Sequence, residues 1–274
     1  MEIRRIQFDN IHDLDLAHIF ECGQCFRWLP AEDGSGDYIG AAGGYAARAS
    51  CGGTTLILDV TGGDEAFWRE YFDLDTDYGA IKARLTESEP AIEAAVKYGA
   101  GIRILKQDLF ETIISFIVSQ NSNIPRIRKN IESICRTYGE YIGEVSGREL
   151  YAFPAPEALA AADIDDLTEL RLGYRSRYIR AAGEKFAACC RPECREDVLD
   201  YPGVGPKVAN CVMLFGLRDT AAFPVDTWVR HIMNEMYGFS ETDARGMERF
   251  AHEKFGELAG YAQQYLFYYF RDRR

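Results

Sequence analysis

The sequence has no long apolar run. None approaches the roughly 18 residues that a membrane-spanning helix needs, and no apolar core of a signal peptide follows Met1. No internal repeat or low-complexity segment is visible either. Because 47% of the 274 residues are hydrophobic, the chain can bury a sizeable core. We therefore expect a folded, cytoplasmic protein that has no membrane partner.

The sequence also lacks the excess of positive charge that is typical of nucleic-acid-binding proteins, since its formal net charge is −12 at pH 7. Most of this charge lies in residues 1–100, which hold 8 basic and 18 acidic residues. Residues 101–274 hold 23 basic and 25 acidic residues, and the segments 101–137 and 171–231 each carry a net charge of +3. The acidic total therefore does not exclude DNA as a ligand of the C-terminal part.

The eight cysteines do not indicate a disulfide framework, because free thiols are more common in intracellular chains of this size. Cys22 and Cys25 have the spacing of half a zinc site, but no second Cys or His pair stands at a usual distance. Cys189, Cys190 and Cys194 lie in one short stretch. Buried thiols are the interpretation that we favour for both groups.

Two patterns divide the chain. Up to about residue 80, short apolar runs such as 38–41 and 54–60 alternate with Gly-rich turns, which predicts an antiparallel sheet. From about residue 81 the pattern is helical throughout. Helices are predicted at 106–120, 125–138, from 154–156 onward, 165–171 and 175–190. We expect an α+β protein with an N-terminal antiparallel β domain over 1–100 and a larger, all-helical region over 101–274.

The most informative segment is 199–211, Leu-Asp-Tyr-Pro-Gly-Val-Gly-Pro-Lys-Val-Ala-Asn-Cys. It ends one helix, turns through two glycines and begins another helix at Pro206, which predicts a helix-hairpin-helix at about 195–216. Gly203 and Gly205 allow a positive φ and leave backbone N–H groups uncovered. Such amides at a helix N-terminus bind a phosphate without reading bases. An ordinary Gly-rich corner is the alternative, but the full Pro-Gly-Val-Gly-Pro-Lys run favours a nucleotide-phosphate site.

Lys207 and Asp226 are the candidate catalytic residues. Lys207 lies just inside the second helix of the hairpin, where the positive end of the helix dipole favours the neutral amine that nucleophilic attack needs. Asp226 follows 19 residues later in Phe-Pro-Val-Asp-Thr and would cap the next helix. A helix of roughly ten residues (about 15 Å) and a return loop can bring the two together. A solvated lysine and a purely structural cap are the alternatives.

The hairpin, Lys207 and the Pro-Val-Asp226 loop resemble the signature of helix-hairpin-helix base-excision DNA glycosylases. A lysine at this position implies the bifunctional branch, which combines glycosylase and lyase activity. No cysteine follows Cys211, so the four-cysteine iron–sulfur loop of the endonuclease III branch is absent. The chain is similar to 8-oxoguanine DNA glycosylases over nearly its whole length, and the implied fold is a TATA-binding-protein-like sheet followed by helical subdomains. Four further segments carry the likeness: 22–28, 119–127, 172–178 and 259–267.

The resemblance implies a pocket for the flipped base, formed by Gly23, Cys211, Gln263 and Phe267. 8-Oxoguanine differs from guanine chiefly by O8 and by an N7–H donor, which the carbonyl of Gly23 would accept. Gln263 would bind the Watson–Crick edge through its amide. Phe267 lies four residues further on, on the same helix face, and would stack on the base opposite Cys211. A glycine in a turn and core burial of Phe267 and Cys211 are the alternatives.

The resemblance also implies contacts with duplex DNA that carries 8-oxoguanine opposite cytosine. Asn121 would fill the space left by the base, Tyr174 would wedge the neighbouring step, and Arg126 and Arg175 would hydrogen-bond the estranged cytosine. A structural or surface role is the alternative for each arginine. No cofactor and no catalytic metal is implied, and we expect a nucleoid-associated monomer. The hairpin residues expected at the DNA are Gly203, Val204, Gly205 and Val208.

One position departs from the family, because many relatives carry His two residues after the catalytic aspartate and this chain has Trp228. A phosphate contact there would have to use the indole N–H. Three other functions stay open: a glycosylase for another oxidised or alkylated base, a non-catalytic DNA-binding module, and a protein-interaction scaffold. The pocket residues oppose the first, and the retention of Lys207 and Asp226 opposes the second. The third would leave the hairpin amides without a ligand.

Overall fold

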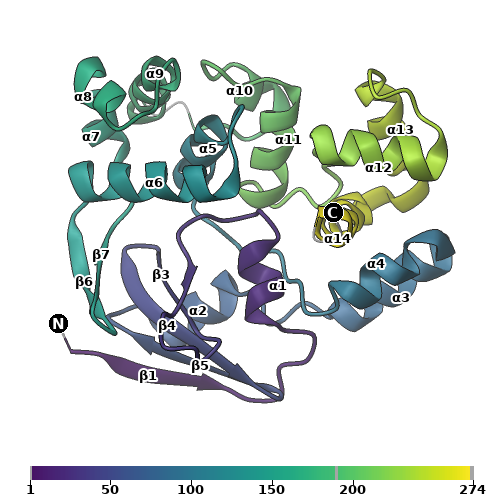
Figure 1. The fold of residues 1–274 in the computed structure, drawn as a ribbon, viewed down its shortest axis with the longest axis horizontal. Coiled ribbons are helices and arrows are strands. Elements are labelled where there is room, and N and C mark those ends of the chain that lie inside the picture. Colours follow the sequence, from purple (N-terminus) through teal and green to yellow (C-terminus); the bar gives the residue numbers. More distant parts are fainter. Residues whose placement is uncertain (1, 189–190, 272–274) are drawn as a thin grey trace.

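The computed structural model describes residues 2–188 and 191–271. One side of the molecule is a five-stranded antiparallel sheet of order β1-β5-β4-β3-β2 (Figure 1). Along β5, buried side chains alternate with half-buried ones, so the strand presents one face to the core. The strands predicted at 38–41 and 54–60 are confirmed as β3 and β5. The strands are β1 Arg4–Phe8, β2 Leu29–Pro30, β3 Tyr38–Ala42, β4 Tyr45–Gly52 and β5 Thr55–Val60.

Two helices, α1 (Leu16–Glu21) and α2 (Glu65–Tyr71), pack on the sheet and were not predicted. Each begins at an aspartate whose side chain accepts a backbone N–H: Asp15 caps α1 and Asp64 caps α2. Their aromatic side chains form the core of this part with Trp28, which stacks on Phe20 at a centroid separation of 4.5 Å. Both helices are only six or seven residues long, too short to show a helical period against the surrounding strands.

The remainder of the chain is mainly helical and has its own apolar core (Figure 1). At its centre lies α5, where every residue except Glu111 is buried. The helices predicted at 106–120, 125–138, 154–156, 165–171 and 175–190 are found, with ends that differ by a few residues. The helices of this part are α3 Tyr78–Ser88, α4 Glu93–Tyr98, α5 Leu109–Val118, α6 Ile124–Tyr138, α7 Pro156–Ala160, α8 Ile164–Glu169, α9 Arg175–Ala187, α10 Arg195–Leu199, α11 Pro206–Phe215, α12 Thr227–Tyr237, α13 Ala244–Phe255 and α14 Ala259–Arg271, with short 3-10 turns at Pro90–Ile92 and Gly256–Leu258.

The prediction of helix throughout residues 81–274 is wrong at one place. β6 (Tyr141–Val145) and β7 (Arg148–Tyr151) form an antiparallel hairpin, and Figure 1 shows it extending from the helical part to the sheet. Its two-residue turn, Ser146-Gly147, has positive φ at both residues. The apolar side chains of the hairpin form a small core with the outer face of β3 and β4. A contact between distant segments therefore decides its conformation.

The cysteines are only partly as expected. Cys22, Cys25, Cys135 and Cys211 are buried free thiols. Cys194 is exposed at the N-cap of α10, so the prediction of a buried thiol there is wrong. Two members of the same group, at 189–190, lie outside the described residues. Among the described residues, no group of three or more His, Cys, Asp or Glu side chains could hold a metal ion.

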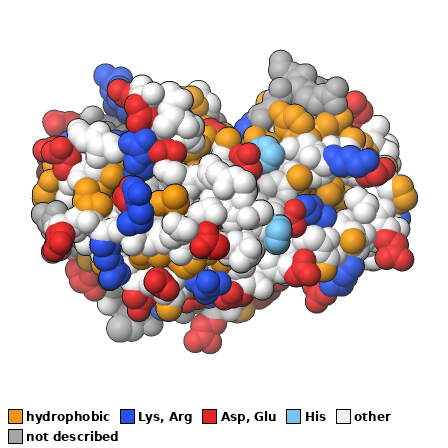
Figure 2. All heavy atoms as spheres, turned by 90° about the horizontal axis from the view of Figure 1, so that it is seen from below, with side chains coloured by type: hydrophobic (Ala, Val, Ile, Leu, Met, Phe, Trp, Pro, Cys, Tyr) orange, Lys and Arg blue, Asp and Glu red, His pale blue; other side chains and the backbone are white. Residues whose placement is uncertain are grey.

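The surface on the side of the N-terminal sheet carries acidic and basic side chains interspersed, without one large patch of either sign (Figure 2). Several of the acidic residues are paired there. Arg48 lies 2.7 Å from both Asp33 and Asp37, and Arg5 lies 2.8 Å from Asp59. Pairs with basic residues beyond residue 100, such as Arg128 with Glu21 at 3.0 Å and Arg218 with Glu70 at 2.7 Å, partly offset the acidic excess of residues 1–100. Over the two described stretches of chain, no helix is both long and apolar enough to cross a bilayer.

Candidate active site

The hairpin joins α10 to α11 through residues 200–205. Gly203 has φ +80°, and a Cβ there would lie 2.4 Å from the ring of Tyr178, so glycine is required on both grounds. Gly205 has φ −101° and extended backbone as the N-cap of α11, so the expectation of a positive φ at this glycine is wrong. No atom lies within 4 Å of a Cβ built on Gly205, which leaves the turn open on that side.

The N-terminus of α11 offers free backbone donors. Gly205 has no side chain that could cap the helix, and the amides of Lys207 and Val208 have no acceptor in the described part of the chain. Val204 differs, because its N–H donates to the Tyr201 carbonyl over 3.0 Å. The expectation of an uncovered amide is therefore wrong at Val204 and holds for the first turn of α11. Open amides at a helix N-terminus are an anion-binding arrangement.

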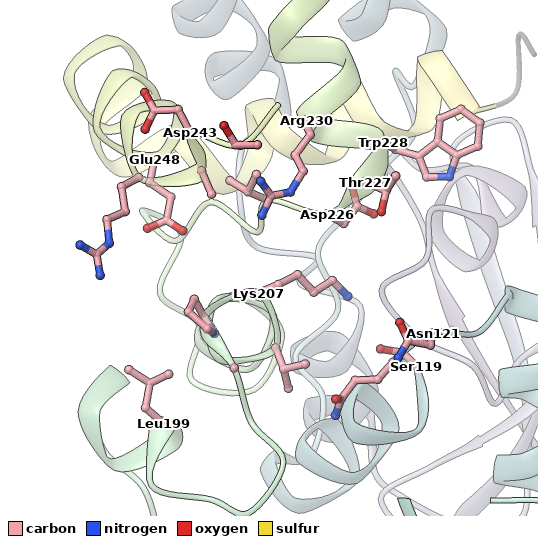
Figure 3. A pocket seen from close by; sticks show the side chains of 18 of the residues that line it. Ser119, Asn121, Leu199, Lys207, Asp226, Thr227, Trp228, Arg230, Asp243 and Glu248 are labelled. Atoms are coloured by element: carbon pink, nitrogen blue, oxygen red, sulfur yellow. The ribbon is translucent and has the colours of Figure 1, made fainter. Parts of the chain in front are cut away.

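The Lys207 side chain extends from the first turn of α11 into the space between Asp226 on one side and Ser119 and Asn121 on the other (Figure 3). It is partly buried, and Nζ lies 5.2 Å from the centroid of the Phe116 ring. The amine thus lies in a partly buried space, next to the face of the Phe116 ring. This position lets it reach a group held between the hairpin and the Asp226 loop.

Asp226 is the N-cap of α12, and its Oδ1 accepts the backbone N–H of Val229 over 2.8 Å. Burial raises the pKa of this carboxyl, while the Val229 amide and the nearby Lys207 act in the opposite direction. The predicted cap is therefore present, and the same carboxyl faces Lys207. A carboxylate held at low dielectric interacts more strongly with a developing positive charge than a solvated one.

The four predicted base-pocket residues line one small cavity together with Lys207 and Asp226. Gly23 has φ +79°, and a Cβ built on it would lie 3.1 Å from the Phe267 ring. A side chain there would be strained by the positive φ and would press on the ring, so both features favour glycine. The cavity measures about 40 Å³, enough for a few water molecules but too small for a purine, so a base can enter only if side chains move. Gly23 and Phe267 are half-buried, whereas Cys211 and Gln263 are buried.

The segment that carries Gly23 is held by Gln24, which is 1% exposed. Its Nε2 donates to the carbonyls of Ile19 and Arg103 over 2.9 and 2.7 Å, and its Oε1 accepts the N–H of Leu105 over 2.8 Å. The backbone carbonyl of Gln24 accepts Gln107 Nε2 over 2.8 Å. The hydrogen bonds of Gln24 thus join residues 22–28 to residues 103–107, just before α5. Sequence reasoning assigned no role to Gln24.

A second cluster brings together residues 119–123 and 173–175. Asn121 has φ +47°, which is rare for a side-chain-bearing residue, and its Nδ2 donates to the exposed Tyr174 hydroxyl over 3.0 Å. Arg175 is 4% exposed and donates to the carbonyls of Gln120 and Leu172. In this structure its guanidinium supports the 119–123 loop from within. Arg126 is exposed at the start of α6.

The small cavity adjoins a large cleft of about 1230 Å³, bounded by the hairpin, the 119–122 loop, the Asp226 loop and α13 (Figure 3). Trp228 lines this cleft and is half-buried. Arg245 and Arg249 line it from one face of α13, are exposed, and form no ion pair within the described residues. Sequence reasoning missed both, although their four-residue spacing is a signal for a shared helix face.

A network of polar side chains joins the hairpin to α13. Arg195 Nε donates to Asn210 Oδ1 over 2.9 Å, and Asn210 Nδ2 donates to Glu248 Oε1 over 3.0 Å. The other oxygen of Glu248 lies 3.9 Å from Arg195. Asn210 Nδ2 also donates to the Phe223 carbonyl, just before the Asp226 loop. The network therefore connects the helix of Lys207 with the loop of Asp226.

Comparisons with known proteins agree with this geometry. Residues 6–113 match the N-terminal domain of 8-oxoguanine DNA glycosylase, and residues 114–257 match the HhH-GPD superfamily of base excision DNA repair proteins. The N-glycosylase/DNA lyase of Saccharomyces cerevisiae is 30% identical over 273 residues, which cover 84% of this chain and 70% of the yeast protein. A probable N-glycosylase/DNA lyase of Methanothermobacter thermautotrophicus is 35% identical over 196 residues, and the match covers 61% of this chain and 62% of that relative.

Among solved structures, the 8-oxoguanine glycosylase/lyase of Clostridium acetobutylicum superposes with a TM-score of 0.91. It is 37% identical, and the match covers 100% of this chain and 98% of that one. That structure was solved with double-stranded DNA containing cytosine opposite 8-oxoguanine. The likeness therefore extends over both the sheet and the helical part.

Proposed function

Since the chain belongs to the 8-oxoguanine DNA glycosylases of the HhH-GPD superfamily, we propose that it excises 8-oxoguanine from duplex DNA and then cleaves the strand at the abasic site. The observation that carries this proposal is the convergence of Lys207, Asp226 and the four base-pocket residues on one cavity. The test is incubation with duplexes that carry 8-oxoguanine, uracil or 3-methyladenine, with and without borohydride. Only the 8-oxoguanine duplex is expected to give base release and a trapped complex; equal release of uracil or 3-methyladenine would contradict the proposal.

The first step is the presentation of the base. The free amides at the start of α11 hold a phosphate on the 3′ side of the lesion, and the target base rotates out of the duplex stack toward the cavity. Because the cavity is smaller than a purine, entry of the base requires movement of its lining, and the half-buried Phe267 side chain is a candidate for this movement. The Gly23 carbonyl then accepts N7–H, and Gln263 binds the Watson–Crick edge.

The chemical steps follow from the positions of Lys207 and Asp226. The neutral amine of Lys207 attacks C1′, the C1′–N9 bond breaks, and its electron pair leaves with the base, which takes up a proton. Asp226 stabilises the positive charge that develops on the sugar or accepts the proton of the attacking amine. Opening of the sugar ring gives a Schiff base between Nζ and C1′. Loss of a C2′ proton then expels the 3′ phosphate by β-elimination.

The duplex itself is held by the second cluster. Asn121 and Tyr174 stand side by side beside the hairpin, since Gln120 Nε2 donates to the Gly203 carbonyl over 3.0 Å. Asn121 would occupy the gap in the stack, with Tyr174 wedged at the next step. Of the two arginines expected at the estranged cytosine, Arg126 is exposed, whereas Arg175 must release the carbonyls that it now binds. All these groups come from one chain, which is consistent with a monomer at the nucleoid.

We expect excision to be faster opposite cytosine than opposite adenine. Cytosine O2 and N3 both accept hydrogen bonds from an arginine, whereas the N6 amine of adenine would face another donor. A bidentate contact discriminates by about 1–3 kcal/mol, or roughly 5- to 150-fold. Arg126→Ala should shrink this preference and leave excision opposite cytosine mostly intact. The measurement is the single-turnover rate of excision with each of the four bases opposite the lesion. Equal wild-type rates with all four would contradict the assignment of Arg126 to the estranged cytosine.

Arg245 and Arg249 are expected to contact DNA phosphates from α13. Both line the cleft, and neither forms an ion pair among the described residues, although two cations spaced four residues apart on a helix repel each other. The double variant Arg245→Gln/Arg249→Gln should bind duplex DNA on the order of tenfold more weakly, and the slope of log K against log salt should fall by about 0.9 per lost contact.

The matched control removes the same charge elsewhere. Arg69 and Arg84 are exposed on α2 and α3, outside the cleft, and pair with Asp75 and Glu257. The variant Arg69→Gln/Arg84→Gln should keep the wild-type salt slope. If both double variants lowered the slope equally, the effect would reflect net charge and not a contact by α13.

A further inference from the structure

The base cavity contains a buried glutamine, Gln264, that the proposed mechanism does not use. Gln264 follows Gln263 on α14, is 3% exposed and lines the same cavity as Lys207 and Asp226. Its Nε2 donates to Gln263 Oε1 over 2.7 Å. Its own Oε1 is buried and accepts no hydrogen bond from any described residue. The cavity is therefore lined by two joined amides, one of which keeps an unused acceptor.

The fold alone does not explain this glutamine. A buried oxygen without a donor destabilises the folded state, because it has lost water and gained nothing in return. Buried polar atoms in native proteins are nearly always paired, so an exception calls for an explanation such as a functional role. Methionine has nearly the same length and would fill the position on α14 without an unpaired oxygen of its own, and only the hydrogen bond to Gln263 would be lost. A ligand that supplies the missing donor accounts for the residue.

We propose that Gln264 Oε1 is a second acceptor for the flipped base, and that Gln263 and Gln264 bind its Watson–Crick edge as a pair. This inference rests on the proposed function. The Watson–Crick edge of 8-oxoguanine presents two neighbouring donors, N1–H and the 2-amino group, and one acceptor, O6. A single glutamine offers one acceptor oxygen, and the oxygen of Gln263 already receives the N–H of Gln264. A second acceptor beside it matches the second donor of the base.

The pairing also has a consequence for selectivity. An oxidised adenine has neither N1–H nor a 2-amino group, so the Gln264 oxygen would find no donor at these two positions of the base, and the Gln263 oxygen would keep only the N–H of Gln264. Sites that bind a ligand N–H reject analogues that lack it more strongly than apolar pockets do, because the site's own polar atoms stay unpaired. Gln264 thus strengthens the choice of guanine-derived over adenine-derived lesions.

The test compares two substrates that differ by the presence of the base. Single-turnover cleavage is measured on a duplex with 8-oxoguanine opposite cytosine and on the same duplex with a preformed abasic site. Gln264→Met should lower the ratio of the first rate to the second on the order of tenfold, as expected for one lost hydrogen bond to the base. Its melting temperature should stay close to that of the wild type, because the substitution removes the unpaired oxygen of Gln264 but also takes the N–H of Gln264 away from Gln263 Oε1.

Tyr265→Phe is the matched control. The Tyr265 hydroxyl is also buried on α14 without a hydrogen-bond partner in the described chain, but Tyr265 does not line the cavity. Its removal should leave the ratio of the two rates unchanged. An unchanged ratio in Gln264→Met, or an equal fall of both rates, would overturn the proposal. If the wild-type protein cleaves the abasic site but does not excise 8-oxoguanine, the proposed function fails and the pairing with it, whereas an unchanged ratio in Gln264→Met beside an active wild type overturns the pairing alone.

Discussion

Replacing Lys207 by Gln is expected to abolish base excision and the borohydride-trapped complex with an 8-oxoguanine duplex. Glutamine is one atom shorter and uncharged, so it loses the amine that lies over the Phe116 ring and cannot attack C1′ or form a Schiff base. Removal of a nucleophile lowers rates by roughly 10³-fold or more. Binding should change little, since the phosphate is held by backbone amides that the substitution leaves in place.

The control for this prediction is Lys97→Gln, a substitution at an exposed lysine of α4 that pairs with Glu93. It should retain wild-type excision and trapping. Both variants are assayed by gel for the covalent complex and by release of the free base. Undiminished trapping by Lys207→Gln would assign the nucleophile to another amine.

Asp226→Asn is expected to bind lesion DNA nearly as well as the wild type and to excise the base roughly 10²- to 10³-fold more slowly. The carboxylate acts mainly as charge develops in the transition state, so its loss lowers the rate and not the affinity. Single-turnover rates at saturating enzyme separate the two effects. A large fall in affinity with an unchanged rate would reverse the assignment.

The same substitution should stabilise the fold at neutral pH. Asparagine caps a helix as well as aspartate does, so the bond to the Val229 amide can persist. Burial raises the pKa of Asp226 in the folded state, so folding stability falls as the pH rises from the ordinary aspartate value of about 3.9 through the raised value. The asparagine variant lacks this term. Its melting temperature relative to the wild type should therefore increase from pH 4 to pH 7, and a constant difference would contradict the burial of an ionised Asp226.

Local chemistry made much of this site predictable from the sequence. The turn before Lys207 is built by Gly and Pro, whose backbone preferences are the same in any fold. An aspartate directly before a helix, such as Asp226, is recognised as an N-cap from the local sequence alone. The buried helix α5 has an apolar period that needs no partner to be recognised. These elements depend on neighbours in the sequence, and the structure has them where the pattern placed them.

The remainder depends on contacts between distant segments. The β6–β7 hairpin is extended because its apolar side chains meet the sheet. Arg175 is turned inward by its hydrogen bonds to the 119–123 loop. The unpaired oxygen of Gln264 becomes visible only when every donor around it has been accounted for. No periodicity or motif carries this information.

The most direct test of the account is peptide mapping of the complex that borohydride traps between the wild-type protein and an 8-oxoguanine duplex. After nuclease and protease digestion, mass spectrometry locates the residue that carries the reduced sugar fragment. We expect a single adduct, on the peptide that contains Lys207. An adduct on another lysine or on the N-terminal amine, with Lys207 unmodified, would contradict the account.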